Sequence, residues 1–180
     1  MSNVIHQPRE AEGPLDHGLP PGVIKCSSTL GLEVHKADGT VIDRGIVSRR
    51  VVTRVGVQEI VRAFSGLSTP VGLVNFKWHQ SGTGGAVAAT SADTDLNTQY
   101  GVARVSGTQT NPAAAGDNYY YYTEATVPYT SSVTVNEHGI FSSDEGGTDV
   151  LFDRHTDFSQ AVNNGDSLVF KYTLTVAAAG

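Results

Sequence analysis

Residues 167–176 read Ser-Leu-Val-Phe-Lys-Tyr-Thr-Leu-Thr-Val, and this stretch decides the fold class. Leu168, Phe170, Tyr172, Leu174 and Val176 occupy every second position and alternate with a set that includes a lysine and two threonines. Because successive side chains of a β-strand point to opposite faces, this period of two predicts a strand with one buried face. A sheet built from such strands needs a second layer to cover that face.

Further strands are predicted on both sides of this stretch. Leu30, Leu32 and Val34 alternate with smaller or polar residues, and the following Asp38-Gly39 pair is typical of a β-hairpin turn. The return strand continues through residues 41–47, where Gly45 is a candidate for a β-bulge. More short strands are expected at residues 72–79, 100–107, 119–129, 132–142 and 149–158. The sequence therefore predicts a mainly β protein, a single β-sandwich or jelly-roll-like domain with one short helix and an extended N-terminal arm.

The only helical pattern covers residues 54–68. Its apolar residues recur at helical spacing and form one stripe, and Thr53 is suited to cap the first turn. We expect this stripe to contact the core, and it consists of Val57, Ile60, Val61, Phe64 and Leu67.

The first 22 residues differ from the rest of the chain. They hold four of the seven prolines and show almost no apolar periodicity, so we expect an extended arm over 1–22 and a β-sandwich domain over 23–180. The arm is either a free terminus or a segment that becomes ordered on a neighbouring protein. In the second case its contacts are expected from its apolar residues and one proline, namely Val4, Ile5, Pro8, Leu15 and Leu19.

Charge and hydropathy narrow the classes of partner. The chain has 12 lysines and arginines against 18 aspartates and glutamates, a formal net charge of −6. An acidic chain is poorly suited to bind phosphates, so no nucleic-acid partner is expected. No apolar run approaches the ~20 residues of a membrane span, and no secretory signal pattern stands at the N-terminus. We therefore expect synthesis in a cytoplasm and no membrane partner.

Two acidic groups of residues resemble metal sites. Asp93 and Asp95 imitate the start of a calcium loop, but Thr98 and Arg104 stand where that loop needs glycine and glutamate. A self-capping turn is the expected structure there. Asp149, Asp153, His155 and Asp157 would share one face of a strand, which favours either a divalent cation or a solvated acidic surface.

Glu137 and His138 are adjacent, so on a strand they point to opposite faces and do not form an acid–base pair. We predict no enzyme activity, no catalytic residue and no cofactor.

Four consecutive tyrosines, residues 119–122, offer a further contact surface. On a strand two of them face each way, and one pair is expected outside. The outward pair Tyr120 and Tyr122, together with Tyr129, is predicted to contact a protein or a sugar. The alternative is that neighbouring strands cover both pairs.

Six stretches of this chain resemble, in the same order, a group of tailed-bacteriophage virion proteins. They are residues 49–64 (RRVVTRVGVQEIVRAF), 75–84 (NFKWHQSGTG), 104–109 (RVSGTQ), 134–142 (TVNEHGIFS), 151–158 (LFDRHTDF) and 164–175 (NGDSLVFKYTLT). These phage proteins are small, β-rich components of heads and tails. The resemblance covers about residues 49–180, and none of its matches is a catalytic motif.

The resemblance implies a structural component of a virion. One placement is a capsid decoration, or cement, protein that clasps neighbouring major capsid subunits at the head surface; the other is a tail, baseplate or fibre-attachment protein. A compact domain with a long arm favours the first placement, because the arm can span to a neighbouring subunit at about 3 Å per residue. That placement also suggests a homotrimer on a local symmetry axis. A glycan-binding receptor module is a further alternative, based on the tyrosines and acidic faces alone.

Overall fold

The computed structural model describes residues 4–6, 24–50, 52–66, 72–101, 103–144 and 149–178. It confirms the predicted mainly β fold, with three sheets and one α-helix in those ranges. No helix of the described residues is long and apolar enough to cross a lipid bilayer.

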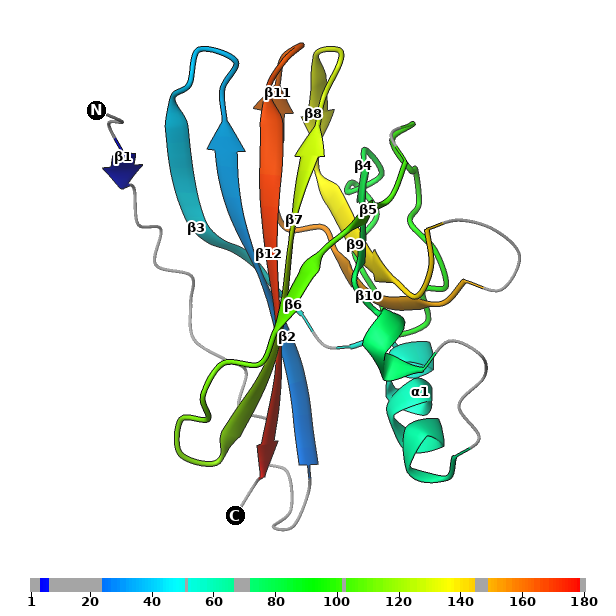
Figure 1. Cartoon of the computed structure of the whole chain (residues 1–180). Coiled ribbons are helices and arrows are strands. Elements are labelled where there is room, and N and C mark those ends of the chain that lie inside the picture. Colours follow the sequence, from blue (N-terminus) through cyan, green and yellow to red (C-terminus); the bar gives the residue numbers. More distant parts are fainter. Residues whose placement is uncertain are drawn as a thin grey trace.

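The largest sheet has six strands in the order β1-β3-β2-β12-β7-β6. Neighbouring strands within this sheet are antiparallel, except that β1 runs parallel to β3 (Figure 1). Its strands are β1 (Val4–His6), β2 (Ile24–His35), β3 (Val41–Arg50), β6 (Thr108–Thr110), β7 (Asn118–Pro128) and β12 (Ser167–Ala178). The stretch that opened the sequence analysis is therefore the central strand, paired along nearly its whole length with β2 and β7.

Two smaller sheets complete the β structure (Figure 1). One has the order β10-β9-β4-β5, and the other pairs β11 with β8. Their strands are β4 (Trp78–Gly82), β5 (Val105–Ser106), β8 (Val133–Val135), β9 (Glu137–Phe141), β10 (Leu151–His155) and β11 (Gln160–Val162). The main core lies between these sheets and one face of the large sheet, because its buried residues come from both sides.

The alternation along β12 and β2 places the core as expected. Leu168, Phe170 and Tyr172 are fully buried, and so are Leu30 and Val34 across the β2–β12 ladder. Burying each large apolar side chain contributes about 1.5–3 kcal/mol, so this row is a main source of the stability of the fold. The β2–β3 hairpin also forms, with Gly39 in the left-handed region at φ 86° and a register shift beside Gly45.

The helix α1 (Arg54–Phe64) begins at the predicted residue and ends four residues before the predicted end, and the Thr53 side chain accepts a hydrogen bond from the Gly56 amide. The predicted core contact of its apolar stripe is wrong for most members. Val61 and Phe64 are 61% and 85% exposed, and Val57 is also exposed. The buried positions are Gly56 and Glu59, because the absence of a side chain at Gly56 lets the helix approach β10 closely. Ile60 packs partly against the core, and Leu67 lies outside the described residues.

Several predicted strands are shorter or divided. Residues 72–77 are not a strand: η1 (Leu73–Asn75) is a 3-10 turn, and β4 starts only at Trp78. Side chains of the neighbouring strands hold this turn, since the Tyr121 hydroxyl donates to the Phe76 carbonyl and the Gln109 amide donates to the Val74 carbonyl. The stretch 132–142 divides at Asn136 into β8 and β9, which belong to different sheets. Among the described residues of 100–107, which leave out residue 102, only Val105–Ser106 forms a strand.

Part of the predicted arm is described. Val4–His6 forms β1 and pairs with Val41–Asp43 at the edge of the chain's own large sheet. Pro8, Leu15 and Leu19 lie outside the described residues. The division into an arm over 1–22 and a domain over 23–180 therefore stays a prediction.

Candidate functional site: a buried polar cluster on β4, β9 and β10

The strongest concentration of chemistry-bearing side chains in the described residues lies on the small sheet. Six titratable residues of β4, β9 and β10 are buried: His79, Glu137, His138, Asp153, Arg154 and His155. The register places Arg154 opposite Gly139 and His155 opposite His138. Because side chains alternate along each strand, the cluster divides into an ionic part facing the loop 83–98 and a histidine part facing the large sheet.

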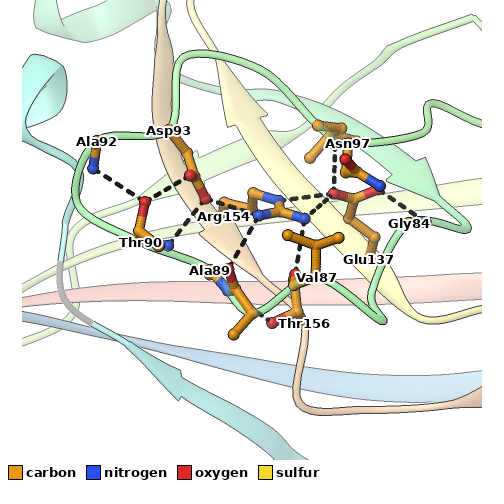
Figure 2. Close-up of polar contacts among 12 residues, drawn as sticks. Gly84, Val87, Ala89, Thr90, Ala92, Asp93, Asn97, Glu137, Arg154 and Thr156 are labelled. Atoms are coloured by element: carbon orange, nitrogen blue, oxygen red, sulfur yellow. Dashed lines mark hydrogen bonds and ion pairs between the residues drawn. The ribbon is translucent and has the colours of Figure 1, made fainter.

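Glu137 is the centre of the ionic part (Figure 2). Its Oε1 atom accepts hydrogen bonds from Arg154 Nε and from the Asn97 amide, both at 2.7 Å. Its Oε2 atom accepts from the amides of Gly84 and Thr98, each at 3.1 Å. The carboxylate is fully buried, and these donors compensate for its lost hydration.

Arg154 connects the carboxylate of Glu137 to the far side of the loop (Figure 2). Its Nη1 atom donates to Asp93 Oδ2 at 2.8 Å, and its Nη2 atom donates to the Val87 carbonyl at 3.1 Å. Asp93 also accepts from the amide and hydroxyl of Thr90, so its side chain caps a turn over residues 90–93, just before the stretch where the sequence predicts a self-capping turn. The ionic part therefore fastens the loop 83–98 onto β9 and β10.

The pKa directions agree with this role. Partial burial would raise the pKa of Asp93, but the Arg154 guanidinium and the Thr90 hydrogen bonds outweigh it and the pKa is lowered. Burial likewise opposes the charge of Arg154, and Asp93 and Glu137 reverse that effect and raise its pKa. The groups are charged and saturated with partners, which is the arrangement of a structural anchor.

The histidine part contains a direct ring-to-ring contact. His79 Nδ1 lies 3.1 Å from His138 Nε2, and His79 Nε2 lies 3.2 Å from Thr123 Oγ1 on β7. One ring must donate and the other accept, so the accepting ring is neutral. Burial lowers the pKa of His79 to about 3, and burial, followed by the repulsion that a protonated ring would meet from its histidine neighbours, lowers the pKa of His138. Both rings are therefore neutral at pH 7.

The second ring nitrogen of His138, Nδ1, decides the tautomers of both rings. His138 Nδ1 is buried without a hydrogen-bond partner in the described structure. A bare acceptor is less costly there than an unpaired N–H. We therefore assign the proton of His138 to Nε2, which donates to His79, while His79 Nε2–H donates to Thr123.

The third histidine also lies among polar groups of the core. His155 Nδ1 is 2.9 Å from Ser48 Oγ, and its Nε2 atom is 3.5 Å from Asp153 Oδ2. Asp153 accepts from the Tyr172 hydroxyl at 3.1 Å, and burial together with this carboxylate raises the pKa of Tyr172. Serine, histidine and aspartate are residue types of hydrolase triads, but all three side chains are buried here. A substrate would have to enter the protein core to reach them, so the arrangement fits a role in stabilising the fold.

The four residues considered as a candidate cation site, Asp149, Asp153, His155 and Asp157, do not come together. Asp149 pairs with Arg104 at 2.5 Å and Asp157 pairs with Arg50, while Asp153 and His155 face the core. A register shift between Leu151 and Asp153 interrupts the regular alternation on which the prediction of one shared face rested. In the described ranges no three His, Cys, Asp or Glu residues are arranged to hold a metal ion.

The tyrosines divide between the two faces of β7, with two differences from the prediction: Tyr119, on the same side as Tyr121, is 63% exposed, and Tyr129 is buried. The Tyr121 hydroxyl bonds to Phe76 inside, so the half-buried Tyr120 and Tyr122 lie on the outer face of β7. Tyr129 is only 1% exposed and belongs to the core, so its predicted partner contact is wrong. It follows the end of β7 at Pro128, and its amide donates to the Asp166 carbonyl, which turns the chain inward there.

Sequence reasoning missed the roles of His79, Arg154 and Glu137 as a group. The one available signal was the alternation of polar residues on β9 and β10, which places Glu137 and His138 on opposite faces. Their partners lie far away in the chain: 59 residues separate His79 from His138 and 61 separate Asp93 from Arg154.

Comparisons with known proteins add no relative to this description. No protein-family model matches the chain, and neither a curated protein nor a solved structure matches it.

Proposed function

We propose that this chain is a non-enzymatic structural protein of a tailed-bacteriophage virion, and that it acts as a capsid decoration protein. In this role it sits on the head surface, clasps neighbouring major capsid subunits and stabilises the shell. One support is the set of six stretches that resemble phage virion proteins and follow in the same order along the chain. The other is a β fold whose buried charged residues bond to one another and to a loop of the same chain.

The observation that carries the clasp is the pairing of β1 with β3. Val4–His6 adds a parallel strand to the sheet edge through Val41–Asp43. Within the described residues β1 covers only these three positions of β3, which continues to Arg50. Strand addition relies on main-chain hydrogen bonds, so the same N-terminal segment is suited to pair with the edge of another subunit.

The contact set of this proposal is smaller than the sequence suggested. It keeps Val4, Ile5, Pro8, Leu15 and Leu19 of the arm and the outward-facing Tyr120 and Tyr122. Tyr129 is excluded because it is buried.

The test compares binding of the full chain and of a chain lacking residues 1–22 to purified particles. We expect electron microscopy to locate the full chain on the head in a fixed number of copies, and we expect the truncated chain to bind at least about tenfold more weakly. Particles with the full chain should also resist heat better than bare particles.

Two point variants refine this test. Ile5→Pro removes a backbone donor within β1, whereas Ala11→Pro changes the arm beyond that strand. The clasp predicts weaker binding for Ile5→Pro alone. Density on the tail would reassign the chain to tail, baseplate or fibre attachment, and equal binding of the full and truncated chains would refute the clasp.

A further inference from the structure

One end of the molecule exposes an apolar surface that the fold does not use. Five of the nine exposed large apolar side chains in the described residues lie on α1 and η1, which contact each other. We call them the α1–η1 face: Val57, Val61, Phe64, Leu73 and Val74. On α1 they follow the spacing i, i+4 and i+7, so they share one side of the helix.

The helix is held in place by other residues. Thr53 caps its first turn and donates a hydrogen bond to the Phe152 carbonyl at 3.0 Å. Gly56 lies so close to β10 that a Cβ atom there would approach Phe152 O to 2.5 Å. Glu59 is buried and bonds to Arg62 at 2.6 Å. Because these contacts fix α1, the exposed apolar side chains are available for a partner, and contiguous patches of this kind mark interaction sites.

The charge around the face indicates the partner. Residues 54–77 hold three of the 12 lysines and arginines but one of the 18 aspartates and glutamates, and that one, Glu59, is buried. This segment therefore carries +2, while the rest of the chain carries −8. Arg54 is exposed and precedes Val57 and Val61 by three and seven positions, on the same side of the helix.

These charges distinguish two ways of self-association. If two α1–η1 faces met on a two-fold axis, two segments of the same positive charge would face each other and repel. If the face instead met a different, acidic part of a second copy, its charge would be complemented. A contact between different surfaces repeats from copy to copy, and it forms a closed ring where the rotation closes and a filament where it does not.

We infer that the α1–η1 face binds a second copy of this chain in a head-to-tail contact. The apolar side chains form the centre of the contact, and Arg54 faces carboxylates of the neighbouring copy. This inference does not depend on a virion role, because it concerns the isolated chain.

The experiment is sedimentation equilibrium of the full chain, whose monomer mass is 19.0 kDa, at about 1–100 µM, the range of weak to moderate association. We expect a mass above that of one chain at the upper concentrations. Phe64→Asp should weaken association at least tenfold, as expected for about 1.5–3 kcal/mol of apolar burial. Raising the salt from about 50 to 500 mM should also weaken it.

Two further variants complete the design. Arg54→Glu is at an exposed position and tests the charge directly, so it keeps the test decisive if Phe64→Asp fails to fold by circular dichroism. Val87→Asp is the matched control, since Val87 is an exposed valine of the loop 83–98 and is not one of the five residues of the face. We expect weaker association with Arg54→Glu and unchanged association with Val87→Asp.

Three results would overturn the inference. The first is a wild-type chain that stays monomeric at every concentration. If such a chain instead sediments with added vesicles that contain phosphatidylserine, the face binds a membrane surface and not a second copy. The second is equal association of Phe64→Asp and wild type. The third is association that Arg54→Glu leaves unchanged, because the head-to-tail contact requires a cationic face.

Discussion

The neutral histidine pair between the sheets links stability to pH. His79 and His138 have lowered pKa values in the folded protein because both are buried, whereas an unfolded histidine titrates near 6.5. Below about pH 6.5 the unfolded chain therefore binds protons that the folded chain does not. The groups around the pair are Thr123, His155 and the stacked Phe170, and none of them is a carboxylate that would stabilise an imidazolium.

The first prediction is a loss of stability in acid. As the pH falls below about 6, each of the two histidines should lower the free energy of unfolding by about 1.4 kcal/mol per pH unit. For His79 this loss continues down to its folded-state pKa of about 3. Urea unfolding at several pH values measures this slope. His138→Phe should reduce the slope, whereas Thr123→Val should lower stability without changing it. An equal slope in His138→Phe and wild type would contradict the argument.

The second prediction concerns the buried carboxylate at the other side of the small sheet. Glu137→Gln keeps the size of the side chain but removes the buried one of the two carboxylates that pair with Arg154, while Asp93 remains. We expect a loss of about 2–4 kcal/mol in urea unfolding, below the ~3–5 kcal/mol of a buried pair whose remaining charge has no other partner. Limited proteolysis should also cut the loop 83–98 faster, because Glu137 accepts the amides of Asn97 and Thr98.

The control for this prediction is Asp157→Asn, which breaks a pair with Arg50 at the surface. A surface pair contributes less than about 1 kcal/mol, so this variant should be nearly as stable as the wild type. If the two variants lost equal stability, Glu137 would not be the anchor described above.

At the scale of single residues, the sequence predicted faces but not partners. The alternation on β9 correctly separated Glu137 from His138. It could not reveal that His138 meets His79, because pairing between strands that are distant in the chain depends on register and topology. The same reason explains Tyr129, whose burial depends on how the chain turns after β7.

Among the elements, α1 differs most from its sequence pattern. The apolar stripe of a helix normally faces the core. Here the side of α1 that carries Gly56 packs against β10, and most of the apolar stripe is exposed. Steric contact explains the choice. The close approach of Gly56 to Phe152 and Val52 requires a position without a side chain, and that requirement outweighs the burial of Val61 and Phe64.

The third prediction tests this docking through Gly56→Ala. Inside an exposed helix this change would stabilise by about 1 kcal/mol. Here the new Cβ atom would meet Phe152 O at 2.5 Å and Val52 Cγ1 at 2.6 Å, so we expect a loss of about 1–3 kcal/mol in urea unfolding. Gln58→Ala, at an exposed position of the same helix, should be neutral or slightly stabilising. Stabilisation by Gly56→Ala would show that α1 tolerates a different docking.

Elements with strong local patterns could be predicted, and those held by side chains could not. β12, β2 and α1 follow their periodicities closely in extent. Residues 72–77 have the apolar spacing of a strand, but hydrogen bonds from Tyr121 and Gln109 hold them as a turn. Such contacts join residues 35 or more positions apart, beyond the range of any local pattern.

At the scale of the whole molecule, we expect the sandwich to fold without the N-terminal segment and the segment to add little to its stability. The described contacts of that segment are the three residues of β1 on β3. Its four large apolar residues, Val4, Ile5, Leu15 and Leu19, would contribute at most about 1.5–3 kcal/mol each if fully buried. Ordering some twenty residues costs about 1 kcal/mol or more for each residue, so the segment cannot be a main source of stability.

The fourth prediction follows for the chain that lacks residues 1–22. It should fold cooperatively, and its free energy of unfolding should be lower by no more than about 1–2 kcal/mol, the scale of a few hydrogen bonds at an edge. In hydrogen exchange the amides of β3 near Val41–Asp43 should exchange faster, while the central amides of β12 and β2 keep their protection. A truncated chain that is unfolded, or that loses protection in β12, would place the first 22 residues within the folding unit. The boundary at residue 22 would then be wrong, and the arm would no longer be free to reach a neighbouring subunit without unfolding its own domain.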